Sequence, residues 1–163
     1  GMSPRGAGGF VVYRPDHWSF AGADVYYGDI LGGETPLVGY ETDGIDYTFR
    51  SGLPYPTGDD GTPDQLEILA ITPVTLEEVD HGHSGSLLSI LDGDLAFAAE
   101  AVYGSDTPEN RDKLRYGSAV ITHMPKGKGE VFCAGTTEWC YALAQGERQV
   151  EAITRNVLNR FLA

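Results

Sequence analysis

Two histidines separated by one residue give the chain its clearest local metal-binding pattern. His81 and His83 lie in residues 80–84, and alternate side chains of an extended backbone point to the same side. Imidazole is a common ligand for zinc and iron. We therefore expect His81 and His83 to bind a divalent or ferric ion together with a carboxylate from the first half of the chain. The alternative is a polar loop that faces solvent, because the segment supplies only two ligands.

Two acidic residues form a second candidate site. Glu41 and Asp43 stand two apart at the end of a predicted strand, so their carboxylates face the same way. Paired carboxylates suit general acid/base catalysis, and we name Glu41 and Asp43 as catalytic candidates, with Glu41 buried beside Tyr40. The alternative is a turn in which Asp43 bonds backbone amides before Gly44 while Glu41 pairs with an arginine.

Aromatic side chains gather in a glycine-rich part of the first half of the chain. His17 and Trp18 are adjacent, and Tyr26 and Tyr27 follow within ten residues. Such rings can form the wall of a binding site for a small organic or sugar ligand. The alternative is that they form the core of a segment with few aliphatic residues.

The two cysteines do not indicate redox or thiol chemistry. Cys133 and Cys140 fit neither a disulfide framework nor a four-ligand zinc pattern, and we expect both to be small buried side chains. A cysteine nucleophile at a strand-to-helix corner would need a later histidine. His123 precedes Cys133 and no histidine follows it, so glutaminase activity is not expected.

The elements that must position these residues differ between the two halves of the chain. Residues 2–65 are dense in turn-forming residues, with strand candidates at 10–13, 37–41 and 47–49. The prolines and glycines between residues 54 and 63 predict a surface loop. This half is expected to be irregular and rich in β-structure.

The second half, residues 66–163, follows more regular patterns. The apolar run at 66–71 predicts a central strand, and residues 119–123 and 130–134 predict an antiparallel hairpin around a glycine-containing loop. Asp94 and Gly104 bound one predicted helix, Thr107 and Pro108 begin a second, and Thr136 or Thr137 caps a third. An amphipathic helix ends the chain, and its apolar positions are Val150, Ile153, Val157, Leu158, Phe161 and Leu162.

These elements predict an α/β fold, a layered sheet with flanking helices in a single domain over residues 2–163. An α+β arrangement is the alternative, because the pattern does not specify whether the strands of the sheet are parallel or mixed. The chain has 11 lysines and arginines against 24 acidic residues, a net charge of −13. This charge disfavours nucleic acid and anionic membranes as partners. With no apolar stretch of the roughly 20 residues a membrane span needs, we expect a cytoplasmic protein.

Four blocks of sequence resemble a known family. They are His-Trp-Ser-Phe-Ala-Gly at 17–22, Val-Gly-Tyr-Glu-Thr-Asp-Gly at 38–44, Gly-Glu-Val-Phe-Cys-Ala-Gly-Thr-Thr-Glu-Trp at 129–139, and Ile-Thr-Arg-Asn-Val-Leu-Asn-Arg-Phe at 153–161. In this order they resemble the C-terminal region of N,N-dimethylformamidase large (beta) subunit-like proteins. The resemblance spans nearly the whole chain and implies a class I glutamine-amidotransferase-like α/β fold. For the characterised enzyme it implies amide hydrolysis with one iron held by tyrosine and glutamate side chains.

The family resemblance does not place an active site in this chain. The family's iron ligands lie upstream of the four blocks, so iron or another metal is a cofactor expectation by resemblance alone. We favour a structural and interface portion of a longer amidohydrolase that is not catalytic by itself. The alternatives are a metal-dependent hydrolase of small amides or related C–N bonds, and a small-molecule or carbohydrate-binding module. An apolar face left uncovered predicts a two-fold homodimer or a partner chain.

Overall fold

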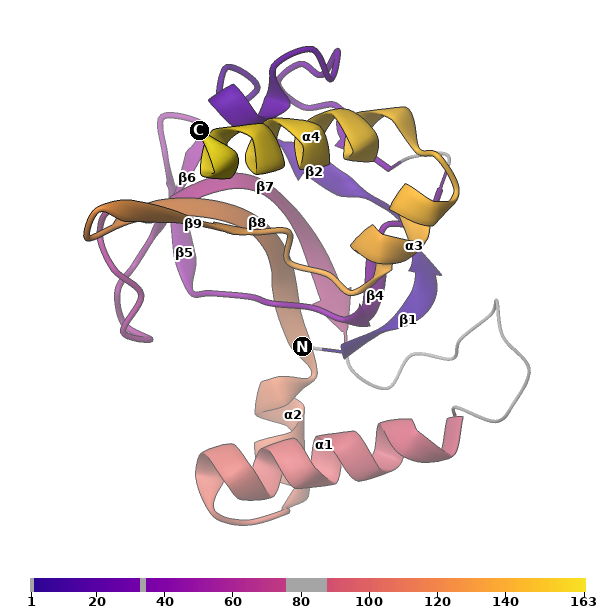
Figure 1. Ribbon diagram of the computed structural model, residues 1–163. Coiled ribbons are helices and arrows are strands. Elements are labelled where there is room, and N and C mark those ends of the chain that lie inside the picture. The colour runs from indigo at the N-terminus through magenta and orange to yellow at the C-terminus, as the bar shows by residue number, and fades with distance from the viewer. Residues whose placement is uncertain (1, 33–34, 76–87) are drawn as a thin grey trace.

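A five-stranded antiparallel sheet forms the centre of the molecule (Figure 1). The structure is a computed structural model that describes residues 2–32, 35–75 and 88–163, with the backbone alone at 2–7, 40 and 88–94. The strand order is β3-β2-β7-β8-β9. The bounds of these strands are Phe10–Val12 for β2, Ile30–Leu31 for β3, Glu67–Thr75 for β7, Tyr116–Lys126 for β8 and Gly129–Cys133 for β9.

Two small antiparallel pairs and five helices complete the described fold. Strand β1 (Met2–Ala7) pairs with β4 (Val38–Glu41), and β5 (Tyr47–Arg50) pairs with β6 (Leu53–Pro56). The helices are the 3-10 helix η1 (Trp18–Phe20), α1 (Leu88–Tyr103), α2 (Pro108–Leu114), α3 (Glu138–Ala144) and α4 (Arg148–Leu162). Among the described residues, no helix has the length and apolar character needed to cross a membrane.

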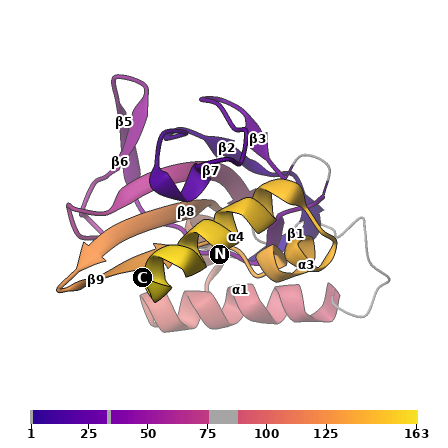
Figure 2. The same ribbon diagram turned by 45° about the horizontal axis from the view of Figure 1, so that its top comes forward.

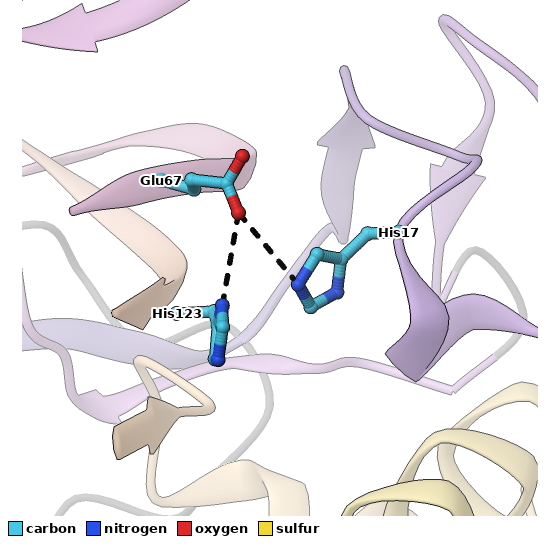
Figure 3. A group of neighbouring side chains, drawn as sticks. All are labelled: His17, Glu67 and His123. Carbon is cyan, nitrogen blue, oxygen red and sulfur yellow. Dashed lines mark ion pairs between the residues drawn. The ribbon is translucent and has the colours of Figure 1, made fainter. Parts of the chain in front are cut away.

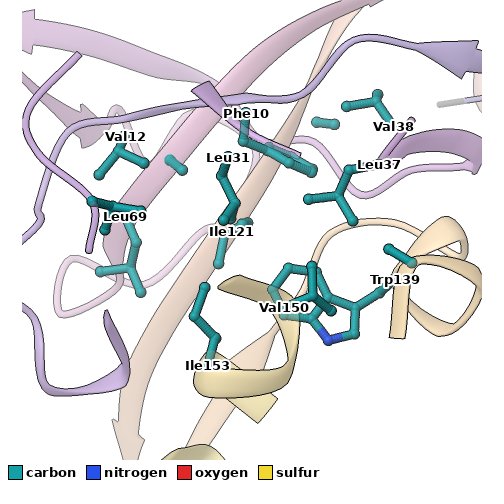
Figure 4. Packing of buried hydrophobic residues seen from close by; sticks show 14 of the residues in the cluster. Phe10, Val12, Leu31, Leu37, Val38, Leu69, Ile121, Trp139, Val150 and Ile153 are labelled. Carbon is teal, nitrogen blue, oxygen red and sulfur yellow. The ribbon is translucent and has the colours of Figure 1, made fainter. Parts of the chain in front are cut away.

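The main core lies between one face of the sheet and helices α3 and α4 (Figure 4). Val150 and Ile153 of α4 are fully buried against strand residues such as Leu69 and Ile121. The helical spacing of the apolar residues in α4 and the period-two alternation of β8 bring these side chains to one layer. Ile68, Ile71 and Val120 form a second, smaller apolar cluster. Side chains of both clusters therefore come from the same two central strands.

Helices α1 and α2 form a separate arm. Figure 1 shows α2 joined to the start of β8 and α1 beside it, with the sheet between these two helices and α4. Thr107 caps α2 by accepting a hydrogen bond from the Asn110 amide, and Pro108 occupies the first helical position. The predicted start of α2 is therefore confirmed.

The elements largely follow the sequence-based predictions. The strands predicted around residues 10, 40, 48 and 68, the hairpin and the C-terminal helix are all present, and the α/β class is confirmed as a mixed fold whose strand pairs are antiparallel. One helix boundary and one loop were predicted wrongly. Helix α1 begins at Leu88, so Asp94 lies inside it. Strand β6 lies where a loop was expected, because Pro54 is tolerated in a two-stranded hairpin that lacks an outer neighbour.

Candidate functional site

Three side chains from distant parts of the sequence meet beside the sheet (Figure 3). One ligand-type atom from each of His17, Glu67 and His123 lies within 4.8 Å of the other two. A carboxylate oxygen of Glu67 is 3.9 Å from Nε2 of His17 and 3.7 Å from Nδ1 of His123. In the part of the chain that the structure describes, this is the one cluster of histidine, cysteine and acidic side chains arranged to hold a metal ion.

Two neighbouring strands position Glu67 and His123. The register of β7 against β8 places these residues directly opposite each other. His123 continues the row of Ala119 and Ile121, which belong to the main core, because alternate residues of a strand share a face. His123 is consequently buried at the end of that core.

His17 reaches the cluster from the loop before η1. Its Nδ1 atom lies 2.8 Å from the Ser19 hydroxyl and 3.3 Å from the Ser19 amide. The Asn156 side chain of α4 donates hydrogen bonds to the carbonyls of Ser19 and Ala21, at 2.9 and 2.7 Å. These bonds tie η1 to α4 and fix the position of the His17 ring.

A second layer of side chains holds His123. Its Nε2 atom is 3.0 Å from a carboxylate oxygen of Glu130 on β9. Arg160 in the last turn of α4 donates two hydrogen bonds to the same carboxylate, at 2.7 and 2.6 Å, and its guanidinium stacks on the Trp18 ring at 4.6 Å. This network connects β8, β9, α4 and η1 around the cluster.

Burial and neighbouring charge shift the protonation of the site. Burial, with a smaller effect from nearby His123, lowers the pKa of His17 to about 4. Hydrogen bonds from Arg160, aided by His123, lower the pKa of Glu130 to about 2. At neutral pH His17 is therefore an uncharged ring and Glu130 is ionised.

The arrangement offers cation ligands instead of a hydrogen-bonded relay. The gaps of 3.7 and 3.9 Å between Glu67 and the two rings exceed hydrogen-bonding distance. Nε2 of His17 and Nδ1 of His123 are buried and have no hydrogen-bond partner. Two imidazoles and a carboxylate differ from the tyrosine and glutamate ligands expected for the family's iron. The cluster does not fit that iron site, and no hydrolytic step is assigned to it.

A cavity of about 480 Å³ opens beside the cluster. His17 and Glu67 form part of its wall. The remaining lining residues are Tyr13, Arg14, Pro15, Asp16, Tyr27 and Leu53. The cluster is thus within reach of a small molecule from one side.

The predicted acidic pair lies elsewhere, at the corner between β4 and the loop before α3. Both Glu41 and Asp43 are exposed, so the expected burial of Glu41 is wrong. Backbone bonds hold this corner: the Thr137 amide donates to the Glu41 carbonyl at 3.1 Å. The Cys133 thiol donates to the Asp43 carboxylate at 3.1 Å. Glu41 is at the surface because β4 pairs with β1 in a separate two-stranded sheet and not within the central sheet.

The four predicted ligand-binding residues line two neighbouring cavities: His17, Trp18 and Tyr26 line one of about 440 Å³, and His17 and Tyr27 line the one of about 480 Å³. His17 and Trp18 lie together, with ring centroids 5.0 Å apart, whereas Tyr26 and Tyr27 are exposed. Tyr27 contacts the Tyr13 ring at 5.7 Å and lines the cavity beside the cluster. His81 and His83, the predicted metal ligands, lie outside the described residues.

The cysteine predictions are confirmed in part. Both thiols are free. Cys133 is half-buried, and burial followed by its bond to Asp43 raises the pKa of its thiol. Cys140 is exposed, which contradicts its predicted burial: it lies on the outer side of α3, while Trp139 and Ala142 pack inward.

Sequence reasoning missed Glu67, His123, Glu130 and Arg160 as members of a site. One feature of the sequence could have indicated His123. It lies four residues after Ala119 in a predicted strand, so both side chains point to the same face, and His123 is buried if that face packs against the core. A buried histidine requires partners. The identity of those partners depends on the β7–β8 register and on the path of α4, which no local pattern specifies.

Comparison with known proteins identifies the family of this chain. No curated protein and no solved structure matches the chain. The family described as N,N-dimethylformamidase beta subunit-like, C-terminal, matches residues 1–152. This match covers three of the four blocks, at η1, β4 and the β9–α3 corner, and confirms the resemblance drawn from the sequence. With the match extending over most of its length, the chain belongs to the N,N-dimethylformamidase beta subunit-like family, C-terminal region.

Proposed function

We propose that this chain is a structural and interface domain of an N,N-dimethylformamidase-like amidohydrolase and does not hydrolyse amides by itself. The family is named for a beta subunit, which is consistent with a chain that works beside others. Glu41 and Asp43 are exposed and so lack the burial by which enzymes tune catalytic carboxylates, which supports the proposal. The class I glutamine-amidotransferase-like fold and the cytoplasmic location remain part of the proposal.

The observation that carries the interface role is a partly apolar groove between the α1–α2 arm and the sheet, which is open in the part of the chain that the structure describes. Its volume is about 680 Å³. Val102 of α1 is 62 % exposed and Tyr116 at the start of β8 is 75 % exposed, and Ile45, Tyr47 and Leu114 continue the lining. Apolar residues gathered in this way at a surface mark an interaction site.

The occupant that we propose is a second copy of this chain. The groove also carries Lys113 together with Asp46 and Asp60. A two-fold contact places one patch against itself, so a patch with charges of both signs can pair them across the axis. A patch with acidic charge alone would repel its copy, given a net charge of −13 per chain.

Light scattering on the purified chain at micromolar concentration tests the proposal. We expect a dimer mass for the wild type and a monomer mass for the Val102→Glu, Tyr116→Glu variant, because two buried carboxylates would lack partners. The control is Leu162→Glu at the end of α4, which is exposed and lies outside the groove. It should remain dimeric.

Two outcomes would contradict this proposal. A monomeric wild type would show that the groove does not receive a second copy. Turnover of N,N-dimethylformamide by the isolated chain, absent from a Glu41→Gln, Asp43→Asn variant, would instead establish the hydrolase alternative. Circular dichroism on every variant verifies that the fold is intact.

A further inference from the structure

We propose that His17, Glu67 and His123 form a binding site for one divalent transition-metal ion. The first observation is that two buried ring nitrogens point into the cluster without partners. The side chains of His17 and His123 are 8 % and 10 % exposed, and their facing nitrogens make no hydrogen bond. Buried polar atoms nearly always have a hydrogen-bond partner. Two buried nitrogens that have none and that face the same carboxylate therefore indicate a ligand-binding site.

The proton on His123 is already directed away from the cluster. An ionised carboxylate only accepts hydrogen bonds, so Nε2 of His123 donates to Glu130. The lone pair is then on Nδ1, the atom that faces Glu67. A carboxylate behind a histidine ring is the outer-sphere arrangement typical of metal-binding histidines.

His17 is held differently. The Ser19 amide donates to Nδ1 at 3.3 Å, so the proton of the neutral ring is on Nε2, which faces Glu67. Metal binding at Nε2 then requires this proton to move to Nδ1, where the Ser19 hydroxyl, 2.8 Å away, can accept a hydrogen bond from it. Asn156 holds the Ser19 backbone, so the ring is supported from α4 as well.

Glu67 supplies the negative charge and the freedom to close the site. Its side chain is 48 % exposed, and the two imidazoles around it are buried. Ligands about 2.1 Å from a tetrahedral zinc ion lie about 3.4 Å from each other. The gaps of 3.7 and 3.9 Å to Glu67 close with shifts of a few tenths of an ångström, which a half-exposed glutamate allows. The two ring nitrogens, which lie within 4.8 Å of each other, must also approach for the ion to contact both.

The neighbouring charges favour a cation at this point. Arg160 is bound to Glu130 through two hydrogen bonds, so these two charges offset each other. Glu67 is the remaining charged group of the cluster. Two neutral nitrogens and one carboxylate suit zinc or iron(II), and three protein ligands leave a position free for water or a small ligand. That position has access to the cavity of about 480 Å³ that His17 and Glu67 line.

Metal titration of the whole chain tests this site. The chain is stripped with a chelator, titrated with Zn²⁺ by calorimetry, and loaded with Co²⁺ to record the visible bands of a low-coordinate ion. We expect one equivalent for the wild type. Glu67→Gln keeps the side-chain size, and it should weaken Zn²⁺ binding by more than the roughly 10–100-fold loss typical of an outer-sphere change. Glu130→Gln should weaken binding within that range.

The control is the His81→Ala, His83→Ala double variant, which removes the other two histidines of the chain. It should still bind one equivalent with the wild-type Co²⁺ spectrum. Wild-type affinity in both Glu67→Gln and His123→Ala, loss of binding in the double variant alone, or no binding by the wild type would each overturn the proposal. Circular dichroism separates loss of metal from loss of fold.

Discussion

Gly135 shows how a single residue holds the β9–α3 corner. Its φ is +71°, in the left-handed region, and a Cβ atom there would meet the Val120 carbonyl group. The close approach lets the Asp43 amide bond the Gly135 carbonyl at 3.1 Å. The glycine therefore joins the β4 corner to β8.

We expect Gly135→Ala to lower the free energy of unfolding by on the order of 3 kcal/mol, because backbone strain adds to a backbone clash. Gly146→Ala is the matched control, since Gly146 has a φ of +74° and open space around it. It should lose about 1 kcal/mol. Urea unfolding measures both values, and equal losses would contradict the clash.

His17 should make the stability of the metal-free protein depend on pH. Its pKa is about 4 in the folded chain against an ordinary value of 6.5, so between these values the unfolded chain binds more protons. Stability contributed by the neutral ring is complete above pH 6.5 and is lost as pH falls toward 4. We expect the wild type to lose about 2 kcal/mol of unfolding free energy between pH 7 and pH 5 from this group.

Urea unfolding of wild type and His17→Asn at the two pH values, with chelator present, measures this contribution. Asparagine keeps a good capping residue before η1. The depressed pKa of Glu130, about 2, acts at lower pH and does not enter this range. A pH effect of equal size in both proteins would contradict the assignment to His17.

At the scale of elements, α4 connects the core to the site. Val150 and Ile153 fill the core, the Trp139 indole donates to the Thr154 hydroxyl at 3.0 Å, and Arg160 reaches Glu130 on β9. One helix therefore fixes α3, η1 and β9 relative to each other. Its amphipathic spacing was readable from the sequence.

Truncation of the core face of α4 should be costly. We expect Ile153→Ala to reduce the free energy of unfolding by about 2–5 kcal/mol, since the residue is fully buried and the cavity cannot be refilled easily. Leu158→Ala on the exposed side should change it by less than about 1 kcal/mol. Thermal or urea unfolding compares the two, and similar losses would show that α4 does not pack as described.

For the whole molecule, the net charge of −13 sets the conditions for association. Repulsion between two such chains acts over about 30 Å at 0.01 M salt and about 8 Å at 0.15 M. We expect the dimer fraction to increase between these two salt concentrations, as measured by sedimentation at fixed protein concentration. A dimer fraction that falls with salt would indicate that ion pairs and not the apolar groove drive association.

The sequence alone predicted those elements whose signals are local. The spacing of Val150 and Ile153 predicts α4 because burial of one helix face needs only the 3.6-residue period. Thr107 and Pro108 predict the start of α2 because capping acts within one turn. Blocks of sequence identified the family, whose match includes three of the four, and the apolar run at 66–71 indicated the central strand.

The tertiary structure decided which polar groups meet. Glu67 and His123 are 56 residues apart and become neighbours through the register of β7 and β8. His17 joins them because Asn156 ties η1 to α4. The same long-range packing leaves Glu41 exposed, although its local pattern suggested burial. A local pattern reports which face of an element is apolar, while the meeting of distant side chains depends on how whole elements pack, which no short stretch of sequence encodes.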